Sequence, residues 1–205
     1  MIQKSRIALV VLCSLAFGSV PALAASSGGI PQFKGEWHPV VGAGAVYQME
    51  QKGQPAMSWE IVVVGQEADA YWIENRMNVP QETVSKMLIA PGQVKRLIVK
   101  TAGQPAMEFP VMQAQGFPQT DLKQTAKLVG HEQITTSAGT FACDHYQVQE
   151  QGGPADVWVT PSVSPYGLVK LTSSGMTLTL AKVVKEAKSR ITETPQKLDL
   201  TNLAT

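Results

Sequence analysis

The feature that most constrains the fold is a repeated alternation of apolar and polar residues with a period of two. In the clearest run, Met57, Trp59 and Ile61 alternate with polar residues. Successive side chains of a strand point to opposite faces, so this period indicates strands with one buried face. Similar short runs, separated by Gly and Pro, occur at 71–77, 94–99 and 176–180. We therefore predict a mainly β, antiparallel fold.

The turns between these runs share a motif. Gly-Gln-Pro-Ala-Met occurs at residues 53–57 and again at 103–107, and the looser Gly-Gly-Pro-Ala occurs at 152–155. Glycine can adopt the positive φ of a tight turn, and proline cannot donate a hydrogen bond to a sheet. We interpret all three as hairpin turns or strand starts. The flanking residues differ, which favours convergent turn chemistry over an old duplication.

Two segments have helical spacing. Residues 81–90 place Val84, Met87 and Leu88 at three- and four-residue steps, and Pro91-Gly92 would end a helix there. Residues 120–128 indicate a second short helix. The predicted architecture is a curved antiparallel sheet or half-open β-barrel with one or two short helices on its concave side.

The N-terminal residues have the pattern of a secretory signal peptide. Lys4 and Arg6 precede an apolar run at 7–17, and Ala22-Leu23-Ala24 provides small residues for cleavage. The run is shorter than the ~20 residues that span a bilayer, which disfavours a membrane anchor. No small residue precedes Cys13, so we expect no lipidation.

Cleavage after Ala24 predicts a periplasmic or secreted protein in which Cys143 is the one remaining cysteine. We expect four regions: a signal peptide (1–24), an irregular N-terminal lead-in (25–44), a single β-rich domain (45–191) and a polar C-terminal tail (192–205).

Composition and motifs disfavour several classes of function. Lys and Arg total 17 against 16 Asp and Glu, which argues against nucleic-acid binding. Cys143 and His145 share one face of a predicted strand, but no third catalytic group or cysteine-enzyme signature accompanies them. The other histidines, His38 and His131, lack metal-ligand spacing. We predict no catalytic residue, no metal, no cofactor and a buried, structural Cys143.

The apolar strands support a binding hypothesis. Ile61–Val64 is apolar at successive positions, so one face of that strand can pack while the other lines a cavity. An ordinary filled core has the same pattern and stays open as the alternative. The speculative ligand-lining residues are Trp59, Trp72, Trp158, Met87 and Leu88.

Motifs in the second half of the chain carry a family resemblance. They are Ala-Gly-Thr-Phe-Ala-Cys at 138–143, Ala-Asp-Val-Trp-Val at 155–159 and Pro-Tyr-Gly-Leu-Val-Lys at 165–170. In this order, they resemble a family of uncharacterised exported bacterial proteins, a domain of unknown function related to the periplasmic lipoprotein carriers (LolA/LolB-like). The resemblance covers about residues 70–190. It implies a half-open barrel whose helices close a cavity for acyl chains, but no carrier residue matches position by position.

These observations predict an exported periplasmic binding or carrier-type module for an apolar ligand, such as a lipid or a lipoprotein acyl chain. The alternative is a structural or interaction protein of the cell envelope, with a filled core and a binding edge and without a small-molecule ligand. The expected partners are a lipid, a lipoprotein or an envelope protein, and neither reading makes the protein an enzyme.

Overall fold

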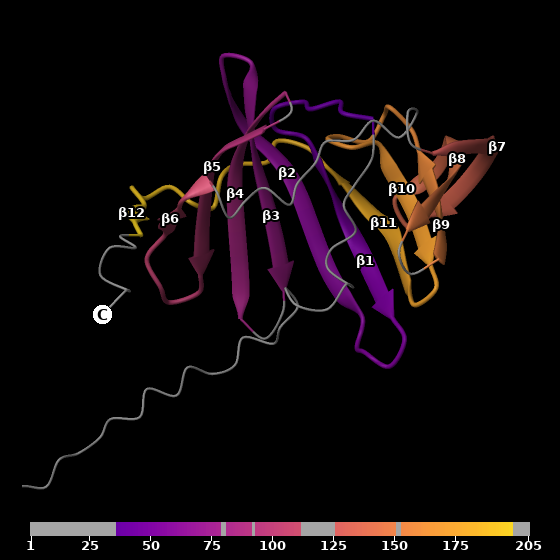
Figure 1. Cartoon of the computed structure of the whole chain (residues 1–205), viewed down its shortest axis with the longest axis horizontal. Helices are drawn as coiled ribbons and strands as arrows, with labels where there is room; N and C mark the ends of the chain where they lie inside the picture. The colour runs from indigo at the N-terminus through magenta and orange to yellow at the C-terminus, as the bar shows by residue number, and fades with distance from the viewer. Residues whose placement is uncertain (1–35, 79–80, 92, 112–125, 151–152, 199–205) are drawn as a thin grey trace, which may run out of the picture. The chain divides into compact units, whose positions relative to one another are not determined.

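The structure is a computed structural model that describes residues 36–78, 81–91, 93–111, 126–150 and 153–198. These residues form a twelve-stranded sheet with the order β12-β6-β5-β4-β3-β2-β1-β11-β10-β9-β8-β7 (Figure 1). The prediction of a mainly β fold is confirmed. The strands are β1 (Gly44–Gln51), β2 (Met57–Glu67), β3 (Ala70–Asn78), β4 (Glu82–Ala90), β5 (Gln93–Thr101), β6 (Met107–Phe109), β7 (Lys127–Thr136), β8 (Gly139–Glu150), β9 (Gly153–Val159), β10 (Leu168–Ser173), β11 (Met176–Val184) and β12 (Gln196–Lys197).

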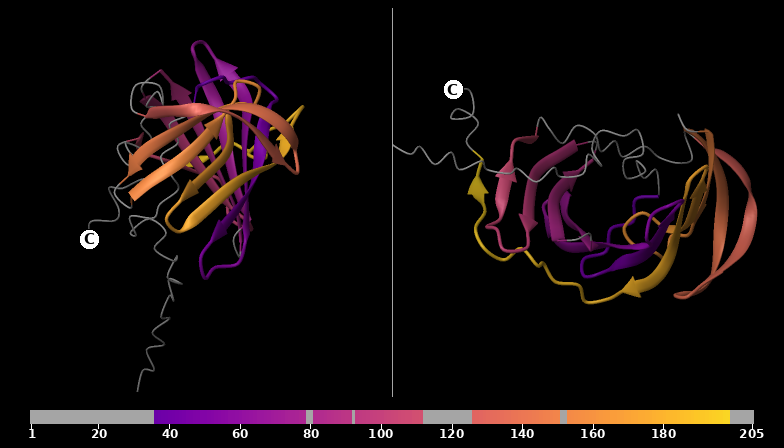
Figure 2. Two further views of the ribbon diagram at one scale, coloured as in Figure 1. Left: turned by 90° about the vertical axis from the view of Figure 1, so that its right-hand side faces the viewer. Right: turned by 90° about the horizontal axis from the view of Figure 1, so that it is seen from below.

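The sheet consists of two runs of consecutive antiparallel strands, β1–β6 and β7–β11, which Figure 2 shows from two further directions. They meet where β1 pairs with β11. The short β12 pairs with β6 in parallel. Among the described strands β7 and β12 form the two edges, so the sheet is open and the expected half-open barrel is not confirmed.

The helix predicted over 81–90 is wrong, because Glu82–Ala90 is strand β4. This strand pairs with β3 and β5 and is apolar on both faces near its end. In a strand, Val84 and Leu88 point to one face and Met87 to the other. A strand buried on both faces can therefore imitate the three- and four-residue steps of a helical stripe. The described residues contain no α-helix.

The predicted turns are confirmed. Gly53 and Gly103 have φ values of 79° and 77°. Each turn is closed by the same hydrogen bond, from the amide after the glycine to a carbonyl three residues earlier, with an N–O distance of 3.0 Å in both. The third motif starts β9, where Gly153 has a φ of 112°. Glycine adopts these angles without the steric cost that a Cβ atom brings.

Other predicted segments fall partly outside the described residues. The signal peptide and the first part of the lead-in lie in residues 1–35, which the structure does not describe. Of the second predicted helix, residues 120–125 also lie outside, while Lys127 and Leu128 belong to β7. Within the segment expected to be a polar tail, Gln196 and Lys197 form β12.

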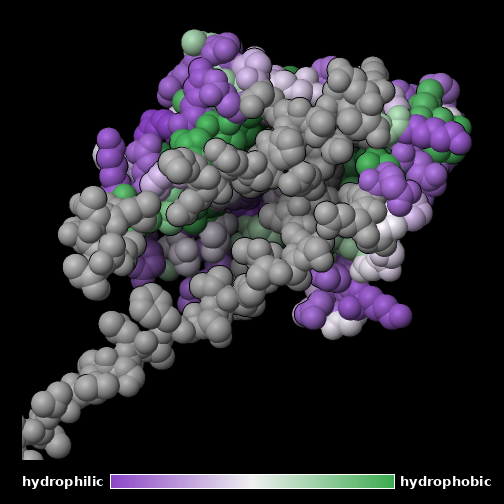
Figure 3. All heavy atoms as spheres, in the orientation of Figure 1, coloured by the Kyte–Doolittle hydropathy of each residue, from purple (hydrophilic) through white to green (hydrophobic). Residues whose placement is uncertain are grey.

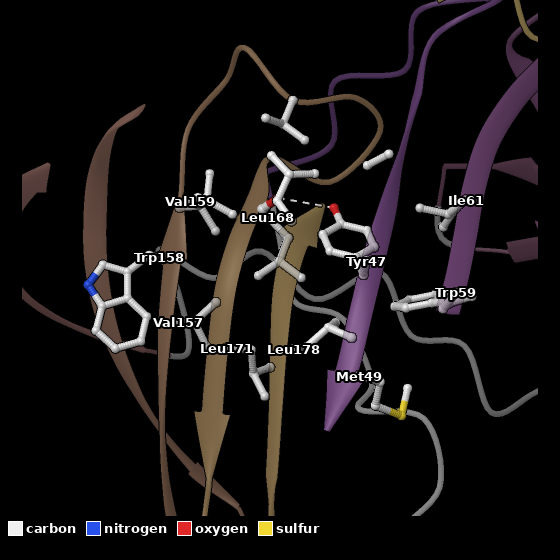
Figure 4. Close-up of a cluster of buried hydrophobic side chains, with 14 of the residues drawn as sticks. Tyr47, Met49, Trp59, Ile61, Val157, Trp158, Val159, Leu168, Leu171 and Leu178 are labelled. Atoms are coloured by element: carbon white, nitrogen blue, oxygen red, sulfur yellow. Dashed lines mark hydrogen bonds between the residues drawn. The ribbon is translucent and has the colours of Figure 1, made fainter. Parts of the chain in front are cut away.

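The apolar face of the sheet carries most of the core (Figure 4). Tyr47 of β1 lies between its cross-strand partners Trp59 of β2 and Leu180 of β11. Such partners project from the same face and pack together. The rings of Tyr47 and Trp59 have centroids 5.5 Å apart, and the Tyr47 hydroxyl donates to the Leu168 carbonyl at 3.0 Å. We call this side the apolar face.

The opposite side, which we call the polar face, carries charged residues in its central strands. Glu74 of β3 is fully buried, and Arg76 donates to it through Nη2 at 2.9 Å. The segment after β11 covers these groups. The Ser189 hydroxyl and the Arg190 amide both donate to the Glu74 carboxylate, the amide at 3.0 Å. Ile191 adds a buried side chain to a second apolar cluster, which also contains Trp72, Val84, Leu88 and Ile98.

Candidate functional site

The five predicted lining residues lie on both faces of the sheet. Trp59 and Met87 belong to the main core on the apolar face. Trp72 and Leu88 are cross-strand partners in the second cluster, on the polar face. Trp158 belongs to the same core cluster as Trp59 and Met87, but it lies at the β7–β10 end, where its cross-strand partners on the polar face are His145 and Lys170. The structure thus divides the five residues between two clusters.

Trp72 lies among charged side chains. Its Nε1–H donates to Glu67 Oε1 at 2.8 Å. The Lys86 ammonium and the Arg96 guanidinium lie 5.1 and 5.2 Å from its ring centroid, at the distance of cation–π contacts. Arg96 also donates to Glu108 at 2.7 Å and lowers the pKa of that carboxyl group.

A row of methionines lies on the apolar face where four adjacent strands begin or end. Met49 of β1 pairs with Met57 of β2, Met77 of β3 pairs with Trp59, and Met176 of β11 pairs with Gln51. Met49 is 5% exposed. The other three are half-buried and pack against the main core. We call Met49, Met57, Met77 and Met176 the methionine row.

No local sequence motif links these methionines. They are far apart along the chain, and their proximity follows from strand order and register. The thioether side chain is unbranched and polarisable, so such a row forms a soft apolar surface that can adapt to the shape of a ligand. It lies at the lower end of the sheet in Figure 1, beside the turns that join β1 to β2 and β10 to β11.

A separate group of polar and aromatic side chains lies on the polar face of β7–β10. His145 Nδ1 is 2.8 Å from Glu132 Oε1, and His145 Nε2 is 2.9 Å from Asp156 Oδ1. The imidazole stacks on the Trp158 ring, with centroids 4.4 Å apart and an interplanar angle of 17°. The Trp158 Nε1–H donates to Glu132 Oε2 at 3.1 Å, and Lys170 Nζ lies 5.0 Å from the ring centroid. We call these five residues the His145 cluster.

The contacts within this cluster favour the charged form of Glu132. The hydrogen bond from Trp158, followed by that from His145, lowers the pKa of Glu132. Cys143 lies on the same face, is 3% exposed and donates to the Phe141 carbonyl at 3.6 Å. Burial raises the pKa of its thiol to about 11. The predicted burial of Cys143 is confirmed.

Cys143 and His145 each have other partners: both ring nitrogens of His145 contact carboxylates, and the Cys143 thiol donates to a carbonyl. His131 Nδ1 lies 2.7 Å from Asp144, and His38 lies 3.1 Å from Glu36. Within the described part of the chain, no three His, Cys, Asp or Glu side chains are grouped so as to hold a metal ion.

Strand β7 forms an exposed edge. All of its ten residues except Val129 pair with β8, and no other described strand lies beyond it. Leu128 and Val129 are 48% and 52% exposed. The space-filling view shows hydrophobic residues at the surface over this end of the sheet (Figure 3). A bulge between Leu128 and Gly130 interrupts the ladder, which is one way in which proteins limit pairing at sheet edges.

Comparisons with known proteins give little further information. No family model and no curated protein matches the chain. Among solved structures, the chain is similar to one titled "a putative lipoprotein from Parabacteroides distasonis", with 13% identity and a TM-score of 0.37 over 74% of this chain and 99% of that one. At this level the similarity carries no argument about ligand or activity. The part of the chain that the structure describes has no helix long and apolar enough to cross a membrane.

Proposed function

We propose that this chain is an exported envelope protein that binds an apolar ligand, such as a lipid or a lipoprotein acyl chain, without transforming it. The methionine row is the observation that carries the proposal. The N-terminal signal pattern supports the location.

The methionine row lies at the border between core and surface. Met57, Met77 and Met176 are half-buried, so part of each thioether contacts the core and part stays accessible. An acyl chain placed along them would remove apolar surface from water at about 25 cal/mol per Å². Flexible methionines accommodate chains of different shape, which suits a carrier more than a site for one rigid compound.

Methyl NMR tests the proposal directly. Protein labelled with ¹³C at the methionine methyl groups is titrated with lauric acid and with lysophosphatidylcholine. We expect shifts at Met57, Met77 and Met176. Met87, which is 2% exposed, and Met107, which lies near the β12 edge, serve as internal controls and should stay unchanged.

Substitution gives the matching affinity measurement. Met57→Gln and Met77→Gln keep side-chain length but add a polar amide, and each should weaken binding of a fluorescent fatty acid about tenfold. Met107→Gln is the matched control. Row methyls that do not shift with either ligand would refute the proposal, as would equal affinities in all three variants.

The β7 edge supports the alternative, an envelope interaction protein. An edge strand with open backbone groups can accept an extended segment of a partner by strand addition. The exposed Leu128 and Val129 would contact side chains of the added strand.

In-cell photocrosslinking separates this candidate from the first. A photoreactive residue at Val129 should yield one discrete crosslinked protein. The same residue at Val40, which is 58% exposed, is the control for random collisions. Leu128→Lys should abolish the Val129 crosslink by placing a charge at the edge. Identical crosslinking patterns at Val129 and Val40 would rule out the edge as the interaction site.

A further inference from the structure

The His145 ring has a carboxylate at each nitrogen. Its Nδ1 and Nε2 atoms lie 2.8 and 2.9 Å from oxygens of Glu132 and Asp156. An ionised carboxylate only accepts hydrogen bonds, and a neutral imidazole has one N–H to donate. Both contacts are hydrogen bonds only when the ring carries two protons. A neutral ring would direct its lone pair at one of the two carboxylates.

The remaining groups around His145 balance its charge. Glu132 faces it from β7, Asp156 from β9, and Lys170 of β10 reaches the Trp158 ring on which the imidazole stacks. Cys143, on the same face of β8, is a protonated thiol. With a protonated ring, the cluster has two cations and two anions. With a neutral ring, the cluster has a net negative charge beside a largely buried pair of stacked rings.

These contacts join three strands. Glu132 belongs to the edge strand β7, His145 to β8 and Asp156 to β9. Besides its ladder with β8, β7 contacts β10 and β11. The Glu132–Trp158 hydrogen bond also links β7 directly to β9. At the tip of the β7–β8 hairpin, the Ser137 hydroxyl donates to the Ala181 carbonyl of β11 at 3.1 Å.

We infer that His145 is a proton-dependent link, which in its doubly protonated form bridges Glu132 of the edge strand β7 and Asp156 of β9, and which loses one of these two hydrogen bonds when the ring loses a proton. The contacts give the direction of the pH dependence. The protonated form makes both hydrogen bonds, so the link is complete at low pH and is weakened as the pH rises. His145 lies on the polar face, so this link does not depend on the ligand proposed for the apolar face.

NMR can measure the protonation state of the His145 ring. Protein with ¹⁵N-labelled histidine is titrated from about pH 5 to about pH 9, a range that spans the ordinary pKa of histidine. His145→Gln identifies the His145 signals by their loss. At the acidic end we expect both ring nitrogens of His145 to carry protons that correlate with the Glu132 and Asp156 side chains. A single neutral tautomer throughout the range would overturn the inference.

Hydrogen exchange measures the consequence for β7. After correction for the intrinsic pH dependence of exchange, amides of β7 should open about tenfold more at the alkaline end, the factor expected for one lost charge-assisted hydrogen bond. Amides of the central strand β3 are the internal reference. Equal protection of β7 at both ends of the range would also overturn the inference.

Two variants complete the test. His131 contacts only one carboxylate and its side chain is 75% exposed, so His131→Gln should leave the pH step in β7 protection intact. In Asp156→Asn, the amide can donate to a neutral Nε2, so β7 should stay protected to higher pH than in the wild type. This variant keeps the side-chain volume and provides a readout even where His145→Gln fails to fold. A pH step that is unchanged in Asp156→Asn would contradict the proposed role of the second carboxylate.

Discussion

Substitution of Glu74 offers the sharpest test of how the segment 189–191, which follows β11, is held on the sheet. Its fully buried carboxylate accepts hydrogen bonds from the Ser189 hydroxyl, from the amides of Arg190 and Ile191, and from the Arg76 guanidinium. Glu74→Gln keeps the volume but removes the charge. It also turns an amide NH₂ group towards atoms that are themselves donors.

The expected loss in the free energy of unfolding follows from the burial of both Glu74 and Arg76. Removing one member of a buried ion pair costs about 3–5 kcal/mol, because the other charge is left without compensation. Arg76, which is 8% exposed, keeps a second partner in Glu60 at 3.1 Å. We therefore expect the low end of that range, about 3 kcal/mol in the free energy of unfolding. For a domain of this size that corresponds to a fall in Tm of roughly 6–12 °C.

Urea unfolding followed by circular dichroism measures the change, with linear extrapolation to water. Glu82→Gln is the matched control, since Glu82 pairs with Arg190 at the surface and should contribute less than about 0.5 kcal/mol. Ser189→Ala, combined with Glu74→Gln, should show non-additive losses because the two side chains share a hydrogen bond. A Glu74→Gln protein within about 1 kcal/mol of wild type, at an unchanged m value, would refute this reasoning.

Three further predictions concern the core. Tyr47→Phe removes the donor to the buried Leu168 carbonyl and should lower the free energy of unfolding by about 1–2 kcal/mol in the same urea assay. Gly44→Ala would place a Cβ atom 2.2 Å from the Ile61 carbonyl oxygen, so the paired backbones must separate, and thermal unfolding should show a loss of about 1–3 kcal/mol. Burial raises the pKa of Cys143 to about 11, so the thiol should react with Ellman's reagent at pH 8 at least about a hundredfold more slowly than a free peptide thiol. Because the pKa of the thiol is raised in the folded state, its contribution to the free energy of unfolding is complete below the ordinary thiol pKa of about 9 and is lost as the pH rises through 11. Rapid labelling of the native protein by Ellman's reagent would contradict the burial of Cys143 and the pH dependence derived from it.

Much of the fold could be predicted from patterns of residues that are close together in the sequence. The alternation around Trp59 and the turns at Gly53 and Gly103 depend on residues close together in sequence, and the structure has strands and turns there. Strand β4 was missed for a physical reason. Val84 packs in the second apolar cluster and Met87 in the main core, so apolar residues occur on both faces of the strand and hide its period of two.

The candidate sites depend on register and could not be predicted in the same way. Glu132, His145 and Asp156 come from three strands, and the bulge at Leu128–Gly130 helps to set which side chains meet. Nothing local in the sequence distinguishes Asp156 from a solvent-exposed acid. The pairing of Cys143 with His145 on one face was predicted from alternation alone, but the carboxylates that engage the histidine were not.

The strand order has a consequence for how the chain assembles during synthesis. Within β1–β6 and within β7–β11, each strand pairs with its neighbour in sequence, so both groups can form from short-range contacts. The ladder between β1 and β11 instead joins the beginning of the described chain to its last long strand. Until β11 has been synthesised, β1 is an edge strand whose backbone groups on one side are unpaired. Any ribosome-bound or truncated chain that ends after β10 keeps this exposed edge. Closure of this one ladder therefore separates an assembly intermediate prone to self-association from the finished sheet.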